Sequence, residues 1–198
     1  VTGKELALLC GMAALGTLTF PLGAAARTVD SVTATAGSTA EIVYSGETLT
    51  VTNGVESIGN NATGIRAVDD TEVAIGKDIY VHGANSQYNN SYGVYGDSGV
   101  QVKVGTDIVV ESDAGAERVR GIYIDGGYGS SISSTPDIQV GGNISASGIN
   151  TIGIYVSGKN ANIKVDGNVT ASNRNATGGT SKIYVGGDVI SSYDNNGT

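Results

Sequence analysis

The chain is poor in the residues on which many catalytic and metal sites depend. Its 198 residues include one cysteine, one histidine, two prolines and no tryptophan, and only 15% are charged. Because Cys10 has no second cysteine to pair with, the sequence excludes a disulfide framework and a cysteine-based zinc site. His82 cannot form a multi-histidine metal site, and no Gly-x-Ser-x-Gly motif accompanies it. The sequence therefore predicts no enzyme, no cofactor and no metal site.

Positive charge is also scarce. The formal net charge is −8, and the acidic residues are scattered along the chain. Arg118 and Arg120 form the densest basic spot, which is far smaller than the basic patch that nucleic-acid binding requires. We therefore expect no nucleic-acid partner.

Glycine, by contrast, is abundant, with 31 residues spread among short runs rich in Val, Ile and Tyr. Gly, Asn, Asp and Ser separate these runs, which is typical of an all-β protein with many turns. No long pattern of helical period follows residue 26.

The first 26 residues differ from the rest. Lys4 and Glu5 precede a segment without charge from Leu6 to Ala26, which ends in three alanines. This pattern predicts a hydrophobic signal helix over 1–26 that is cleaved on export, with a retained anchor or a buried helix as alternatives. Lipid attachment at Cys10 is disfavoured because the preceding residue, Leu9, is not small. Since the chain opens on valine, we expect the true N-terminus to lie upstream or Val1 to stand for an alternative start codon.

Two short motifs alternate along the remainder of the chain. The first is Gly–Ile/Val–x–apolar or small, and it starts at Gly64, Gly93, Gly121 and Gly153. The second resembles "QVKVGTDIVV", and it starts at Glu72, Gln101, Asp137, Asn162 and Lys182. "EIVYSGETLTV" from Glu41 is interpreted as a degraded earlier copy. Motifs that recur in this way along a chain indicate one structural unit per repeat.

Within each copy the pattern has period two. Val102 and Val104 are expected to face one side of a strand and Gln101 and Lys103 the other. The glycine that follows would bend the chain, because glycine tolerates positive φ. Stacking the units buries their apolar faces in one continuous core. The sequence thus predicts a parallel β-helix, or β-solenoid, with irregular rungs of ~20–32 residues over 41–198 and a linker or cap over 27–40.

Two rows of residues recur at equivalent positions of this predicted coil. The first is an outward-facing candidate contact surface formed by Arg66, Tyr95, Tyr123 and Tyr155. Such a row could bind a glycan or a protein, or could simply pack across rungs and stiffen the outer face. The second is a ladder at the turns formed by Asp78, Asp107, Asn143, Asn168 and Asp188. Its side chains either bond nearby backbone amides or form part of a calcium site, although the calcium nonapeptide is incomplete here.

A carboxylate group is also present at the bend that follows the first motif. Asp69 and Asp70 could join Glu72 in the kind of cluster that polysaccharide-cleaving β-helices use. Acids on a solvated turn are the simpler interpretation, because no basic partner can be placed beside them from sequence.

The Gly-Ile-Tyr-Val and Val-Gly-Gly-Asn/Asp phrases, the cysteine-free chain after residue 26 and the signal-like start together resemble the passenger regions of Gram-negative autotransporters. The resemblance covers 43–198. It implies a right-handed parallel β-helix that crosses the periplasm and reaches the cell surface through a C-terminal outer-membrane barrel, for which this chain has no segment. It also implies a secreted or surface-displayed stalk or adhesin.

Its expected partners are a host or bacterial cell-surface protein or glycan, with self-association possible. A secreted polysaccharide-active enzyme and a trimeric autotransporter head remain as alternatives.

Overall fold

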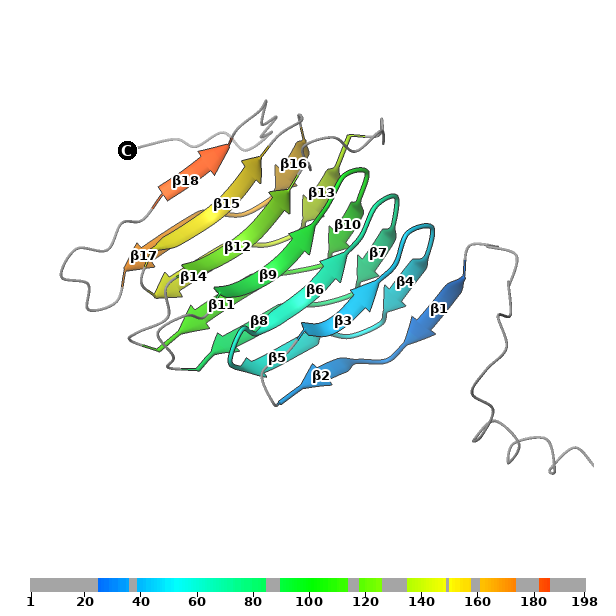
Figure 1. Ribbon diagram of the computed structural model, residues 1–198, viewed down its shortest axis with the longest axis horizontal. Helices are drawn as coiled ribbons and strands as arrows, with labels where there is room; N and C mark the ends of the chain where they lie inside the picture. The colour runs from blue at the N-terminus through cyan, green and yellow to red at the C-terminus, as the bar shows by residue number, and fades with distance from the viewer. Residues whose placement is uncertain are drawn as a thin grey trace, which may run out of the picture.

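Every regular element in the described part of the chain is a β-strand, which confirms the all-β prediction. The computed structural model describes residues 25–35, 39–84, 90–113, 118–125, 135–148, 150–157, 161–173 and 182–185. The strands form a coil whose successive turns lie side by side (Figure 1). Of the signal helix predicted over 1–26, residues 1–24 lie outside the described residues, and Ala26 is the first residue of strand β1.

Three parallel sheets run along the coil, and each turn contributes one strand to each sheet. Sheet A contains β1 (Ala26–Val29), β4 (Thr48–Val51), β7 (Glu72–Ile75), β10 (Gln101–Val104), β13 (Asp137–Val140) and β16 (Asn162–Val165). Sheet B contains β2 (Val32–Ala34), β5 (Val55–Gly59), β8 (Ile79–Gly83), β11 (Ile108–Ser112), β14 (Ile144–Gly148) and β17 (Val169–Asn173). Sheet C contains β3 (Thr39–Val43), β6 (Thr63–Ala67), β9 (Asn90–Gly96), β12 (Arg118–Asp125), β15 (Thr151–Ser157) and β18 (Lys182–Val185). The chain is therefore a parallel β-solenoid, as the repeats predicted.

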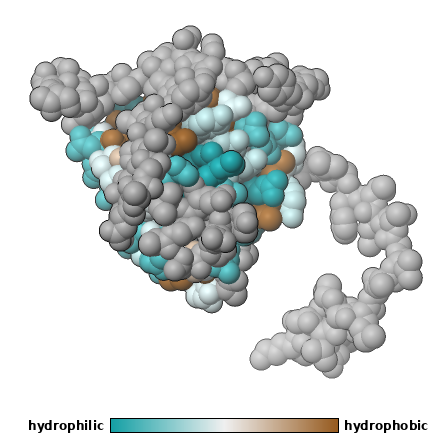
Figure 2. Space-filling view, turned by 60° about the vertical axis from the view of Figure 1, so that its left-hand side comes forward, coloured by the Kyte–Doolittle hydropathy of each residue, from teal (hydrophilic) through white to brown (hydrophobic). Residues whose placement is uncertain are grey.

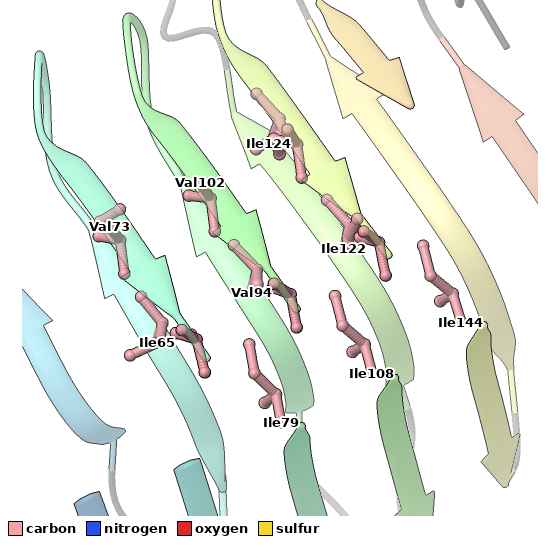
Figure 3. Close-up of a cluster of buried hydrophobic side chains, with 14 of the residues drawn as sticks. Ile65, Val73, Ile79, Val94, Val102, Ile108, Ile122, Ile124 and Ile144 are labelled. Atoms are coloured by element: carbon pink, nitrogen blue, oxygen red, sulfur yellow. The ribbon is translucent and has the colours of Figure 1, made fainter. Parts of the chain in front are cut away.

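The core is built from columns of identical or similar side chains. Ile79, Ile108 and Ile144 occupy matching positions on β8, β11 and β14, and each is fully buried (Figure 3). Each such side chain contributes roughly 1.5–3 kcal/mol when it leaves water. Because every turn repeats the same column, the core extends along the whole coil.

The predicted phase of the strands is confirmed. On β10, Val102 and Val104 are buried, whereas Gln101 and Lys103 are exposed. The side chains of Ile183 and Val185, which repeat this pattern on β18, lie outside the described residues.

One turn of the coil is longer than the predicted range of ~20–32 residues. The register pairs Thr48 with Glu72, Glu72 with Gln101, and Gln101 with Asp137, so successive repeats contain 24, 29 and 36 residues. The longest repeat includes the interval between Asp125, which ends β12, and Asp137, which begins β13. Insertions between strands leave the pairing of the strands themselves unchanged.

The coil begins at Ala26, so the segment 27–40 that the sequence assigned to a linker or cap lies in its first turn. Strand β1 pairs with β4, and β2 pairs with β5, so these residues form the first turn. No residue of β1 or β2 is fully buried, although Val29 and Val32 pack against the core. Among the described strands, this turn has a neighbouring turn on one side only, which explains its weaker burial.

The interpretation of "EIVYSGETLTV" as an early copy of the second motif is wrong. Glu41 pairs with Ile65 in sheet C, and the true equivalent of Glu72–Ile75 is Thr48–Val51 in sheet A. A turn closed by the Glu47 amide and the Tyr44 carbonyl oxygen separates the two strands. The alternation before this turn therefore belongs to a different sheet from the alternation after it.

The corner glycines of the second motif are needed for a different reason from the one predicted. At Gly76, Gly105 and Gly141, an added Cβ would collide with a carbonyl oxygen of the preceding turn. Positive φ angles are instead found at other corners, including those of Asn61, Asp70 and Asn150. Close approach of two turns, rather than backbone conformation, excludes larger residues from these corners.

Candidate functional site

The three predicted tyrosines lie in register on the outer side of sheet C. Strands β9, β12 and β15 pair Tyr95 with Tyr123 and Tyr123 with Tyr155. Their ring centroids are 5.1 Å and 5.0 Å apart, and the planes of Tyr123 and Tyr155 differ by only 11°. In-register parallel pairing imposes this spacing, because neighbouring strands lie about 4.8 Å apart. We refer to Tyr95, Tyr123 and Tyr155 as the tyrosine ladder.

Arg66 ends the ladder on the N-terminal side. It lies on β6, opposite Tyr95, and its guanidinium carbon is 5.4 Å from the centre of the Tyr95 ring. Arg66 is exposed, and a cation over an exposed aromatic face contributes about 0.5–1 kcal/mol. The structure thus brings together all four residues of the predicted contact surface.

Two further residues belong to this surface and were missed from the sequence. Arg120 lies 4.6 Å from the Tyr123 ring centre and 5.2 Å from that of Tyr155, and it donates a hydrogen bond of 3.2 Å to the Tyr92 hydroxyl. Tyr92 in turn packs edge-on against Tyr95 at 5.4 Å. Arg120 therefore joins rings from three successive turns.

A strict period of two could not predict that these two residues lie on the outer side of sheet C. If Tyr95 faces outward, a period of two places Tyr92 on the inner face, and the same holds for Tyr123 and Arg120. The motif glycine breaks the alternation, because Gly93 and Val94 are consecutive and both buried. The residue directly before the motif glycine therefore also faces outward, and this position in the sequence is the signal that could have identified Tyr92 and Arg120.

Stacking leaves the ladder with little free ring face. Tyr123 has Tyr95 on one side and Tyr155 on the other, with Arg120 beside it. Burial raises the pKa of Tyr123 to about 12, and it also raises the pKa of Tyr95. At neutral pH the hydroxyls of Tyr95 and Tyr123 are therefore neutral, and the stacked rings present edges rather than flat platforms for a sugar.

A shallow groove opens where the ladder ends. It has a volume of about 200 Å³ and is lined by Thr39, Thr63, Arg66, Tyr92 and Tyr95. The two threonines occupy, on β3 and β6, the register positions that Tyr92 and Arg120 fill on the following turns. Because threonine is smaller than tyrosine and arginine, the groove is left open at these positions.

A row of carboxylates lies next to the ladder. Burial of Asp97 raises its pKa above 3.8, the nearby charges of Asp69 and Asp125 raise it further, and Arg66 acts in the opposite direction. Glu72, which the sequence grouped with Asp69, instead begins β7 in sheet A, opposite Gln101. Within the described ranges, no group of three or more His, Cys, Asp or Glu side chains is arranged to hold a metal ion.

The turn ladder makes hydrogen bonds from one turn to the next. The Asn143 amide donates to Asp107 Oδ1 at 2.6 Å, and the Asn168 amide donates to Asn143 Oδ1 at 2.9 Å. The Thr106 hydroxyl donates to the Asp78 carboxylate, so this bond joins two side chains. Asp107 and Asn143 thus bond backbone amides of the next turn of the coil, rather than amides of their own corner. Asp188 lies outside the described residues.

His82 lies apart from this surface, on sheet B. Its Nε2 is 3.4 Å from Asp113 Oδ2, and its Nδ1 is 4.0 Å from Glu111 Oε2. The imidazole therefore lies between two partly exposed carboxylates on the outer side of sheet B.

The described surface has little continuous apolar area in the view of Figure 2, where hydrophobic residues are scattered among hydrophilic ones. Among large hydrophobic side chains of the described residues, Tyr44 is the exposed one, at 60%. Large apolar patches mark many protein interfaces. On the described outer side of sheet C, the groups available for contact are aromatic edges, hydroxyls and guanidinium groups.

No helix within the described residues has the length and hydropathy needed to span a membrane. No protein-family model matches the chain, and comparisons with curated proteins and with solved structures give no match either. The repeat and the geometry of sheet C therefore carry the functional argument.

Proposed function

We propose that the chain is the exported, surface-displayed passenger of a Gram-negative cell, and that it acts as a non-enzymatic stalk or adhesin. The observation that carries this proposal is the arrangement of aromatic and guanidinium groups along sheet C, which ends in the groove between Arg66 and Tyr92. Tyrosine and arginine are enriched at binding surfaces, because they combine an apolar body with polar groups.

The structure of the coil suits a stalk. Its core is repeated in each turn, and the turn ladder adds hydrogen bonds between turns. Stability in such a solenoid is the sum of contributions from each repeat and from each interface between repeats, so length can increase without a new core. The tyrosine ladder stiffens one face, and the groove supplies an accessible contact.

The test compares binding of the fluorescently labelled full chain to epithelial cell monolayers and to immobilised glycans. The variant Arg66→Ala/Tyr92→Ala removes two walls of the groove, and Lys103→Ala, on sheet A, is the matched control. We expect the groove variant to bind at least about tenfold more weakly, which corresponds to about 1.4 kcal/mol, and the control to bind as the wild type does. Absence of wild-type binding, or equal binding by both variants, would contradict the proposal.

A second candidate function is cleavage of an acidic polysaccharide. The observation that favours it is the carboxylate row of Asp69, Asp97 and Asp125 beside Arg66, in which the pKa of Asp97 is raised as a general acid requires. The test is release of reducing ends from a panel of acidic polysaccharides by the full chain and by Asp97→Asn. Release that disappears in the variant would replace the adhesin proposal, and no release would remove this candidate.

The trimeric head alternative is tested by sedimentation of the full chain. A monomer would exclude it. A trimer would favour it over a single-chain stalk.

A further inference from the structure

The tyrosine ladder holds phenol rings closer and more nearly parallel than packing of isolated surface residues would. Tyr123 and Tyr155 stack with centroids 5.0 Å apart, and Tyr95 lies 5.1 Å from Tyr123 on the other side. All three side chains are half-buried on a sheet whose strands are locked in register. The rings can therefore rotate locally, but they cannot move apart without breaking the pairing of β12 with β15.

We propose that the ladder is a site of oxidative tyrosine cross-linking, in which Tyr123 couples covalently to Tyr155. The co-reactant is a peroxide activated by a haem peroxidase, which removes one electron and one proton from each phenol. The two phenoxyl radicals join through a carbon ortho to each oxygen, and transfer of the two ring protons to the two oxygens restores both aromatic rings and both hydroxyls. Two phenols and one hydrogen peroxide thus give one dityrosine and two waters.

Tyr123 is the shared member of the two closest pairs. It is nearly parallel to Tyr155, whereas its plane is tilted by 39° from that of Tyr95. Tyr92 is less suitable as a partner, because it meets Tyr95 edge-on, at 79°, and lies farther from Tyr123, at 5.5 Å and with its plane tilted by 42°. Since electrons transfer readily between rings this close, oxidation of any member of the ladder can deliver the radical to the Tyr123–Tyr155 pair.

The neighbouring charges are compatible with this chemistry. The high pKa of Tyr123, about 12, keeps the phenol protonated at neutral pH, so the electron and the proton leave together. Arg120, with its guanidinium carbon 4.6 Å from the Tyr123 ring centre, lies against the pair and limits its exposure to bulk oxidants. A diffusible peroxidase product, or a radical passed from Tyr95, therefore reaches the pair more easily than the enzyme itself does.

Coupling would change the mechanics of the coil. The new bond would join β12 to β15, two successive turns that are otherwise held by ladder hydrogen bonds and packing. A cross-link between turns restricts the unfolded chain and so favours the folded one. Oxidants at a cell surface would therefore strengthen the solenoid rather than damage it, which gives the ladder a role beyond that of a contact surface.

The test treats the dilute full chain with a haem peroxidase and hydrogen peroxide, and follows dityrosine fluorescence and intact mass. We expect a loss of two hydrogens per chain at a rate independent of protein concentration, and a rise in thermal midpoint. Proteolysis at aspartates separates the two residues, because Asp125 and Asp137 lie between them. Mass spectrometry should then identify a Tyr123–Tyr155 cross-linked peptide.

Two variants make the test specific. Tyr123→Phe retains the ring stack but removes the shared phenol, and it should lose most of the fluorescence while its circular dichroism is unchanged. Tyr44→Phe is the control, because Tyr44 is 60% exposed and has no ring partner in the described structure. Cross-links that join different chains, that map to Tyr44, or that persist in Tyr123→Phe would overturn the proposal, as would ring hydroxylation without coupling.

Discussion

Replacing one buried isoleucine, Ile108→Ala, tests whether the stacked columns hold this coil together. Ile108 is fully buried between Ile79 and Ile144. The substitution removes buried carbon atoms and leaves a cavity, which usually costs 2–5 kcal/mol depending on how far the surroundings relax. Relaxation is restricted here, because the Ile108 backbone amide donates a hydrogen bond of 2.8 Å to the Asn143 carbonyl oxygen. This bond prevents the two turns of the coil from sliding past each other. We therefore expect Ile108→Ala to lower the free energy of unfolding by about 3–5 kcal/mol.

The neighbouring residue supplies the control. Val109 lies on the same strand, is half-buried, and faces outward between Tyr80 and Ser145. Val109→Ala removes two methyl groups that are only partly shielded from water, so we expect a loss of about 1 kcal/mol or less. The two substitutions share the strand and the replacement residue; they differ in which face is changed and in size, because isoleucine has one side-chain carbon more than valine.

The measurement is urea unfolding of the full chain followed by circular dichroism, with the midpoint and slope fitted for each variant. A reduced slope would indicate that the turns unfold separately, which solenoids allow. If the two variants differ by less than about 0.5 kcal/mol, or if Val109→Ala is the more destabilised, the inward and outward phase of β11 is wrong.

Four shorter predictions concern other positions. Gly93→Ala should lower stability by about 1–3 kcal/mol in urea unfolding, because the added Cβ would lie 2.6 Å from the Gly121 carbonyl oxygen; an unchanged midpoint would contradict this. Asp107→Ala should cost about 0.5–1.5 kcal/mol through loss of its bond to the Asn143 amide, whereas Asp107→Asn should cost less. Because the pKa of Asp97 is raised when the chain is folded, its ionisation opposes folding. Asp97→Asn should therefore be more stable than the wild type above pH 3.8, with the difference vanishing at lower pH in pH-dependent melts. Because the pKa of Tyr123 is raised in the folded chain, the free energy of unfolding should fall as the pH rises from 10.0, the ordinary phenol value, to about 12. The tyrosinate absorbance of the wild type, compared with that of Tyr123→Phe, should show a titration midpoint near pH 12.

The order of strands and their buried faces could be predicted because they depend on short-range patterns. Alternation placed Val102 and Val104 inside the coil, and the motif Gly-Ile-Tyr placed Tyr123 outside it. Recurrence of both motifs indicated stacking, because a single unit could not bury its apolar side alone. The tyrosine ladder followed from these two facts together.

Residues that meet across turns were harder to predict. The carboxylate row of Asp69, Asp97 and Asp125 was missed although 28 residues separate each member from the next, because Asp69 was grouped with Asp70 and Glu72, its neighbours along the chain. Tyr92 and Arg120 were missed because the bend at the motif glycine interrupts the period of two. The degraded copy at Glu41 was misaligned because two sheets with the same local pattern meet at a turn.

The sequence by itself thus determined the type of element, its inward face and the fact of repetition, since each depends on residues only a few positions apart. Only the tertiary structure decided the register between turns, and with it the groove, the carboxylate row and the contacts of Arg120. Register depends on the length of each corner insertion and on how closely two backbones approach, as at Gly76 and Gly105. Neither quantity is expressed in the alternation of a single strand.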